Sequence, residues 1–209
     1  MGKLFDYDGG IMRVLNKLVD CVFLSVLWIV FSVPIITFGA STTALYYTAN
    51  KVIRHDRSSV LREFWRAFKK NFVQATIVWL ILAVFGTIVI ANCMLFYGTN
   101  KALFILYVVI VCIATMWGLQ VFAQIARFEN KLTAIMKNSA LMSIRHFFST
   151  FLVLVVFAAC LVLVGMWPIL IIILPALFMV AASFILESIY ERYMSPEDLE
   201  LEKERNGEY

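Results

Sequence analysis

Two glutamines and a tryptophan place polar and aromatic groups on one face of an otherwise apolar stretch. Gln120 and Gln124 are one helical turn apart, and Trp117 lies one turn before Gln120. An aromatic ring beside amide donors and acceptors suits a sugar ring, so these three residues form a candidate polar cavity. The alternative role is hydrogen bonding between packed membrane helices, which contributes about 0.6 kcal/mol per bond.

Other residue types that support chemistry do not form recognisable sites. The sequence contains no GxSxG, HExxH or Walker motif, and its two histidines, His55 and His146, lie in basic connections without a triad partner nearby. We therefore expect no enzymatic activity, no cofactor and no bound metal. The cysteines are far apart and form no CxxC pair, so they are expected to be small apolar side chains; they are Cys21, Cys93, Cys112 and Cys160.

The composition is that of an integral membrane protein. Hydrophobic residues make up 62% of the 209 residues and charged residues 15%, and the mean hydropathy is +0.87. A soluble domain is typically about 45–50% apolar and about 25% charged. The net charge of +4 comes from basic residues gathered between apolar segments, which reports membrane orientation rather than nucleic-acid binding. Asp20 and Glu187 are the candidate intramembrane charges, and each is expected near a membrane edge where water reaches it.

A predicted helix break divides the first long apolar run. Thirty uncharged residues lie between Asp20 and Lys51, about 45 Å as a continuous helix, which exceeds one membrane pass. Pro34 lacks a backbone donor and stops or kinks the helix, and Gly39 permits the chain to turn. Thr37 and the hydroxyl residues after it are expected to bond backbone groups freed at this break.

The distribution of Lys and Arg bears on the number of membrane passes, because basic residues collect on the cytoplasmic side. If the break is an outer reversal point, there are six passes with a short second one, both termini are cytoplasmic, and 17 of 18 basic residues lie inside. If the chain does not reverse there, five passes leave the N-terminus outside and 14 basic residues inside. The charge distribution favours six passes, with five as the alternative.

The rest of the chain predicts an all-α polytopic transmembrane bundle with basic interfacial helices. Residues 58–72 and 132–146 are basic amphipathic segments, and each precedes an outward span of about 72–96 or 147–165. The return spans are expected at about 102–126 and 169–189. The first basic segment is either a connector on the membrane surface or a docking face for a partner, with the candidate residues Arg62, Trp65, Arg66, Phe68, Lys69 and Lys70.

Residues 1–194 are predicted to form a single transmembrane domain in the cell membrane. Residues 195–209 form a short acidic tail with six acidic and two basic residues. In both pass counts this tail lies in the cytoplasm.

Several motifs together resemble the YesL-like family of bacterial membrane proteins. They run through nearly the whole chain: Leu27-Trp28, Pro34-Ile-Ile-Thr-Phe-Gly39, Thr43-Ala-Leu-Tyr-Tyr47, Phe64-Trp-Arg-Ala-Phe-Lys-Lys-Asn-Phe72, Ala126-Arg-Phe-Glu-Asn130 and Lys137-Asn-Ser-Ala140. The proline-threonine-glycine stretch and the segment ending at Phe72 are the most specific of these. Trp65 stands where the pattern often has phenylalanine, which is a mild departure.

Members of that family usually accompany ABC importers of oligosaccharides. The resemblance therefore implies a non-enzymatic accessory or assembly subunit, in contact with the lipid bilayer, the importer's permease subunits and the ATPase. The sequence lacks the EAA-type loop and following glycine with which an ordinary permease binds its ATPase. The alternatives are a stand-alone transporter or channel for a small solute, and a membrane accessory of a sugar-sensing system.

Overall fold

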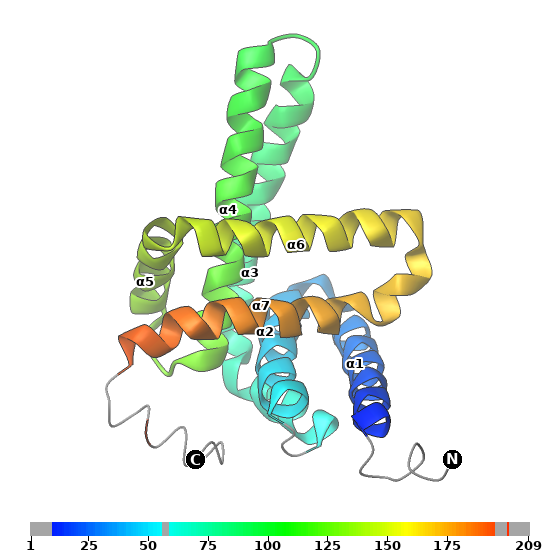
Figure 1. The fold of residues 1–209 in the computed structure, drawn as a ribbon. Helices are drawn as coiled ribbons and strands as arrows, with labels where there is room; N and C mark the ends of the chain where they lie inside the picture. Colours follow the sequence, from blue (N-terminus) through cyan, green and yellow to red (C-terminus); the bar gives the residue numbers. More distant parts are fainter. Residues whose placement is uncertain (1–9, 56–58, 195–199, 201–209) are drawn as a thin grey trace.

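The structure is a computed structural model that describes residues 10–55, 59–194 and 200. All regular secondary structure in these residues is helical (Figure 1). The α-helices are α1 (Gly10–Ser32), α2 (Phe38–Thr48), α3 (Val60–Phe96), α4 (Lys101–Arg127), α5 (Leu132–Arg145), α6 (Phe147–Met166) and α7 (Leu174–Tyr190). The predicted acidic tail, 195–209, lies outside the described residues except for Glu200.

The predicted all-α membrane architecture is confirmed. Five helices of the described chain are long and apolar enough to cross a membrane: Met12–Ser32, Val60–Phe96, Lys101–Arg127, Phe147–Met166 and Leu174–Tyr193. Helix α2 has 11 residues, about 16 Å of rise, whereas a span needs about 20 residues. The structure therefore combines five long apolar helices with one short helix that follows the first.

The chain breaks between α1 and α2, as the proline predicts. Pro34 is extended, with φ −75° and ψ 112°, and one turn of 3-10 helix, η2 (Ile35–Thr37), follows it. The Thr37 hydroxyl lies 2.5 Å from the carbonyl oxygen of Phe31 and 2.7 Å from that of Pro34. Ser41 donates to the carbonyl oxygen of Thr37 at 3.0 Å. The two hydroxyls thus bond carbonyl groups at the end of α1, in the break and at the start of α2.

Helices α1 and α2 form an antiparallel hairpin around this break. The indole N–H of Trp28 on α1 donates to the Thr42 hydroxyl of α2 at 3.2 Å. Further from the break, α1 packs against a π-helix, η3 (Ala49–Arg54), which continues α2. The start of α1 and the end of η3 consequently lie on the same side of the molecule (Figure 1).

Gly39 has a different role from the one expected. It lies in the first turn of α2 rather than in the break, and Gly98 is the glycine with positive φ among the described residues. A Cβ at Gly39 would collide with the carbonyl oxygen of Ala75 and would lie 2.6 Å from the Cβ of Trp79. Gly39 therefore permits a close approach of α2 to α3, and the turn is made by residues before it.

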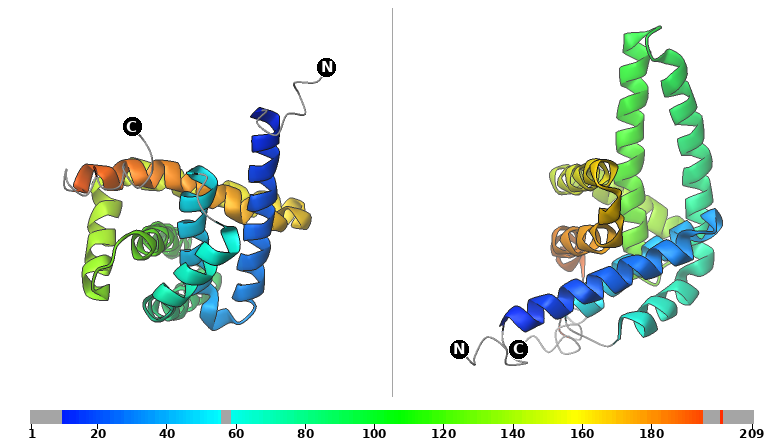
Figure 2. Two further views of the ribbon diagram at one scale, coloured as in Figure 1. Left: turned by 90° about the horizontal axis from the view of Figure 1, so that it is seen from below. Right: turned by 90° about the vertical axis from the view of Figure 1, so that its right-hand side faces the viewer.

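The residues that contact the break show that it does not lie level with the turn between α3 and α4, as an outer reversal point was expected to. The Trp79 indole N–H donates to the carbonyl oxygen of Ile35 at 2.7 Å, and Phe31 packs against Phe64 and Phe68 with ring centroids 5.6 and 5.2 Å apart. These partners lie between Phe64 and Trp79 of α3, well before the turn after Phe96. The break is thus not level with that turn, because α1 lies obliquely to α3 (Figure 2).

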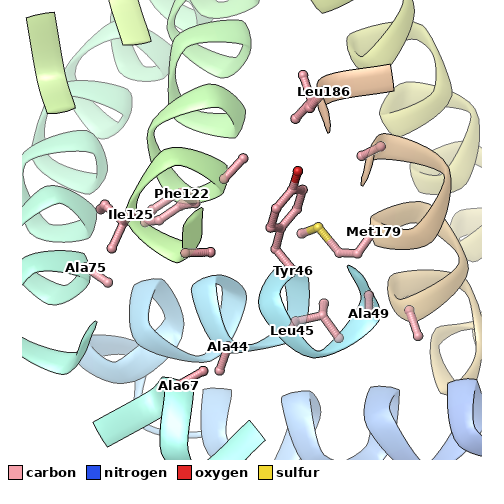
Figure 3. Close-up of a cluster of buried hydrophobic side chains, with 14 of the residues drawn as sticks. Ala44, Leu45, Tyr46, Ala49, Ala67, Ala75, Phe122, Ile125, Met179 and Leu186 are labelled. Atoms are coloured by element: carbon pink, nitrogen blue, oxygen red, sulfur yellow. The ribbon is translucent and has the colours of Figure 1, made fainter. Parts of the chain in front are cut away.

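Helix α2 is the centre of the fold. Nine of its 11 residues are buried, and it packs against α1, α3, α4 and α7. Figure 3 shows Tyr46 and Leu45 pointing from α2 into a cluster that includes Phe122 of α4 and Met179 of α7. Apart from Leu45 its residues are small or aromatic, so four other helices approach one short element.

Helix α3 joins two elements that were expected to be separate. The basic segment 58–72 is not an independent interfacial helix, because its residues continue without interruption from Val60 to Phe96. The 37-residue helix is about 55 Å long at 1.5 Å per residue, longer than a hydrocarbon core of about 30 Å. It bends along its length and pairs with α4 (Figure 2). Asn100 begins α4 by accepting from the backbone N–H groups of Ala102 and Leu103.

The last three helices form a second unit. Helix α5 leads through His146 into α6, and one 3-10 helix, η4 (Pro168–Ile172), separates α6 from α7. The last span therefore begins at Leu174, later than the expected residue 169, because Pro168 and Pro175 each interrupt the helix ladder. The α6–α7 hairpin crosses the α3–α4 hairpin instead of running alongside it (Figures 1 and 2).

The contact at Gly39 generates a stability prediction. Gly39→Ala should destabilise the protein by about 1–3 kcal/mol, because the added methyl group collides with backbone and side-chain atoms of α3. Thermal unfolding in mild detergent measures the effect. Gly86→Ala is the matched control, since a Cβ at Gly86 meets no atom within 4 Å. Equal melting temperatures for Gly39→Ala and the wild type would contradict the predicted contact.

Candidate functional site

Glu187 forms the centre of a buried polar cluster at one end of α7. The residue is 2% exposed, so the expectation that water hydrates it is wrong. The Tyr46 hydroxyl donates to Oε1 at 3.1 Å, and the Asn50 amide donates to the same oxygen at 3.0 Å. The guanidinium Nε of Arg127 lies 3.1 Å from Oε2. This carboxylate thus joins side chains from α2, η3 and α4.

Arg127 and Glu187 form an ion pair within the protein interior. Arg127 is the last residue of α4, and the side chains of the pair are 13% and 3% exposed. Removing two charges from water is costly unless they neutralise each other and their remaining sites are hydrogen-bonded. Tyr46 and Asn50 supply those further bonds to the carboxylate, so the pair fixes the position of α7 against α2 and α4.

The π-helix η3 places Asn50 and Arg54 against α7. π-helical turns are rare and frequently mark functional sites. Arg54 donates to the carbonyl oxygen of Ser183 at 3.3 Å, and its guanidinium lies 4.7 Å from the ring centroid of Phe184. The wider turn therefore directs two polar side chains toward the same helix.

The predicted glutamine pair extends this cluster. Gln120 is fully buried; its Oε1 accepts from the Tyr190 hydroxyl at 2.7 Å, and its amide donates to Thr150 at 3.0 Å. Gln124 donates to the sulfur of Met142 at 3.1 Å. The Trp117 indole donates to the carbonyl oxygen of Met136 at 3.3 Å.

These three residues therefore make contacts between helices. A cavity of about 460 Å³ is lined mainly by apolar side chains, most of them from α3, α4, α6 and α7. Gln120, Gln124 and Trp117 are not among its lining residues. The contacts that they make are those of the interhelical alternative.

The candidate docking residues divide between two sides of α3. Phe68 is buried and stacks on Trp65, with ring centroids 5.8 Å apart. Trp65 is 42% exposed, and the Lys69 ammonium lies 4.6 Å from its ring centroid. Lys70 forms an ion pair with Glu129. The hydrogen bond from Lys70 and its positive charge hold the pKa of the Glu129 carboxyl below its ordinary value.

Four of these residues form an exposed surface. Arg62, Trp65, Arg66 and Lys69 are exposed on the first turns of α3, and we call them the basic face. Its neighbour Glu63 is buried and paired with Lys51 of η3 at 2.8 Å. Phe64 and Phe68 fix the basic face to α1 through Phe31.

No cluster of three His, Cys, Asp or Glu side chains suited to a metal occurs in the described part of the chain. The four cysteines are free thiols. The break residues Pro34, Thr37 and Gly39 act in folding through the contacts given above.

Sequence reasoning did not find the Arg127–Glu187 pair. A usable signal was present, because Gln120, Gln124 and Arg127 follow one another at helical spacing, and Glu187 and Tyr190 do so as well. Arg127 and Glu187 carry opposite charges and lie at the ends of two spans on the same side of the protein, and ionisable residues in membrane helices pair with one another.

Comparison with known proteins finds similarity to a family of unknown function and to one uncharacterised protein. Residues 21–93 match the profile of a family described as "Protein of unknown function, DUF624". The chain is 25% identical over 173 residues to "Uncharacterized protein YteU" of Bacillus subtilis (strain 168), and the alignment covers 78% of each chain. No solved structure matches significantly. The matched residues 21–93 include the break, α2, η3 and the basic face, whereas Arg127 and Glu187 lie beyond them.

The buried pair predicts a distinctive pattern of stability. Glu187→Leu or Arg127→Met alone should cost about 3–5 kcal/mol, because each leaves its former partners unpaired in the interior. Arg127→Met combined with Glu187→Leu should recover most of that loss. Thermal unfolding of the single and double variants measures the coupling.

Glu129→Gln is the control, since the Glu129–Lys70 pair is exposed and should contribute little. Additive effects of the Arg127 and Glu187 substitutions would show that the two side chains are not coupled.

Proposed function

We propose that the chain is a non-enzymatic accessory or assembly subunit of an ABC importer for oligosaccharides. The observation that carries the proposal is the basic face, an exposed set of charges beside a half-exposed tryptophan at the start of α3. Tryptophan and arginine are the residues most enriched in the energetic centres of protein interfaces. The resemblance to YesL-like proteins supports the importer as the partner, and the match to a family of unknown function is compatible with it.

The α6–α7 hairpin supports a role in assembly. Apolar side chains are exposed along α6, among them Phe148, Leu152 and Val162. In the proposed complex, lipid and the helices of the permease subunits cover this surface. The basic face binds the cytoplasmic parts of the permease or the ATPase.

The apolar cavity favours an accessory role over a stand-alone sugar transporter. A sugar site needs polar groups that replace water around its hydroxyls. The lining of the 460 Å³ cavity is instead built mainly from aromatic and aliphatic side chains. A sugar pathway would therefore belong to the partner subunits.

The proposed orientation in the cell membrane places both termini in the cytoplasm. Val14→Cys near the start of α1 should react with a membrane-impermeant maleimide only after the cells are permeabilised. Thr99→Cys, in the turn between α3 and α4, should react in intact cells. Both variants need a background in which the native cysteines are replaced. Reaction of Val14→Cys in intact cells would contradict a cytoplasmic N-terminus.

Reversing charges on the basic face should weaken the proposed complex. Arg62→Glu with Arg66→Glu should lower the amount of permease recovered with the tagged protein by about tenfold, equivalent to 1.4 kcal/mol. The measurement is affinity purification in mild detergent, with the co-eluting chains quantified by mass spectrometry.

Lys131→Glu with Lys137→Glu applies the same charge change at the start of α5 and should leave recovery unchanged. Isolation of the wild type without any importer subunit, under extraction that preserves other membrane complexes, would refute the proposed role.

A further inference from the structure

The 460 Å³ cavity lies where the two hairpins cross. Its walls come from α3, α4, α6 and α7, with Trp28 of α1 and Leu45 of α2 also contributing. The α3 residues in the lining run from Trp79 to Ile90, well inside the apolar part of the helix. The cavity is therefore located within the membrane-spanning portion of the protein.

The polar groups around the cavity are already engaged. The Trp28 indole donates to the Thr42 hydroxyl, and the Trp79 indole donates to the carbonyl oxygen of Ile35. Thr115 donates to the carbonyl oxygen of Val111 within α4 at 2.8 Å. With these three donors committed and nearly all of the remaining lining apolar, the cavity suits a ligand without polar atoms.

The volume of the cavity limits the size of the apolar ligand that it can hold. Apolar cavities remain free of water, whose share of liquid volume is about 30 Å³ per molecule. A methylene group occupies roughly as much space as one water molecule, so the cavity of about 460 Å³ accommodates about 15 methylene groups. That is the length of one lipid acyl chain. A helix of another protein is about 10 Å in diameter with its side chains, and a few turns of it require far more space.

Small residues keep the cavity open. A Cβ at Gly86 would meet no atom within 4 Å, because Gly86 faces the cavity from α3. Ala114 lines the opposite helix, α4. A larger side chain at Gly86 would extend into open space, and one at Ala114 would extend from the lining of the same cavity.

We propose that the cavity binds the acyl chain of a membrane lipid, which fills the space between the crossing hairpins. The chain would contact Phe85 and Val89 of α3, Phe157 of α6 and Phe178 of α7. Its source is a phospholipid of the bilayer or a free fatty acid, which share this chemistry. The inference does not depend on the proposed function, because it concerns what fills the protein and not what the protein binds at its surface.

Photo-crosslinking tests the site in the full-length protein. The protein is reconstituted in vesicles of bacterial phospholipid that contain either a phosphatidylcholine with a diazirine in its acyl chain or a diazirine-bearing palmitic acid. After illumination, adducts are located by peptide mass spectrometry. The expected result is enrichment at the cavity residues Phe157, Cys160 and Val164 over the outward-facing Leu152, Val155 and Val162 of the same helix.

Matched variants separate the cavity from ordinary lipid contact. Gly86→Leu should lower the cavity adducts by about tenfold, the equivalent of 1.4 kcal/mol. Gly165→Leu should leave them unchanged, because Gly165 also has open space around it but does not line the cavity. Ala114→Leu provides a second test if Gly86→Leu does not fold.

The two probes identify the source of the chain. Enrichment with either probe supports the site and names the lipid class. Equal labelling of cavity and outward-facing residues with both probes overturns the proposal, as does cavity labelling that neither filling substitution reduces.

Discussion

A carboxylate remains buried beside apolar helices only if a positive charge and hydrogen-bond donors accompany it, and the arrangement around Glu187 depends on this constraint. Arg127 provides the charge, while Tyr46 and Asn50 provide the donors. These side chains come from α4, α2 and η3, so one ionised group determines where three elements meet α7. Apolar packing alone is non-directional and would allow the helices to slide. The buried pair specifies one register among them.

The second determinant is the central position of α2. A helix of 11 residues cannot cross a membrane alone, yet most of its surface is covered by longer helices. This coverage requires close approach, and Gly39 permits it against α3. The proline and the hydroxyl groups near the break then close the connection to α1 with local bonds. Together these residues make a short, polar-rich segment the structural centre of an apolar protein.

The sequence predicted helix content, the long apolar helices and the break at Pro34 well, because composition and proline chemistry act locally. It did not predict the continuity of α3, since a change from basic to apolar composition leaves helical propensity intact across Phe72. It also misplaced Gly39 and Glu187. Both roles depend on which helix lies opposite, and periodicity identifies a face without identifying its partner. Gln120 and Gln124 illustrate the same limit, because their spacing allowed either a cavity or a helix contact.

The continuity of α3 has a mechanical consequence. The helix carries the basic face at one end and the turn at Gly98 at the other, with no flexible joint between them. Near its middle it is held against α2 at Gly39, which is a natural pivot. The basic face and the distant turn are therefore joined by an unbroken helix of about 55 Å at 1.5 Å per residue. A shift of α2 at Gly39 would act on both ends of that helix at once.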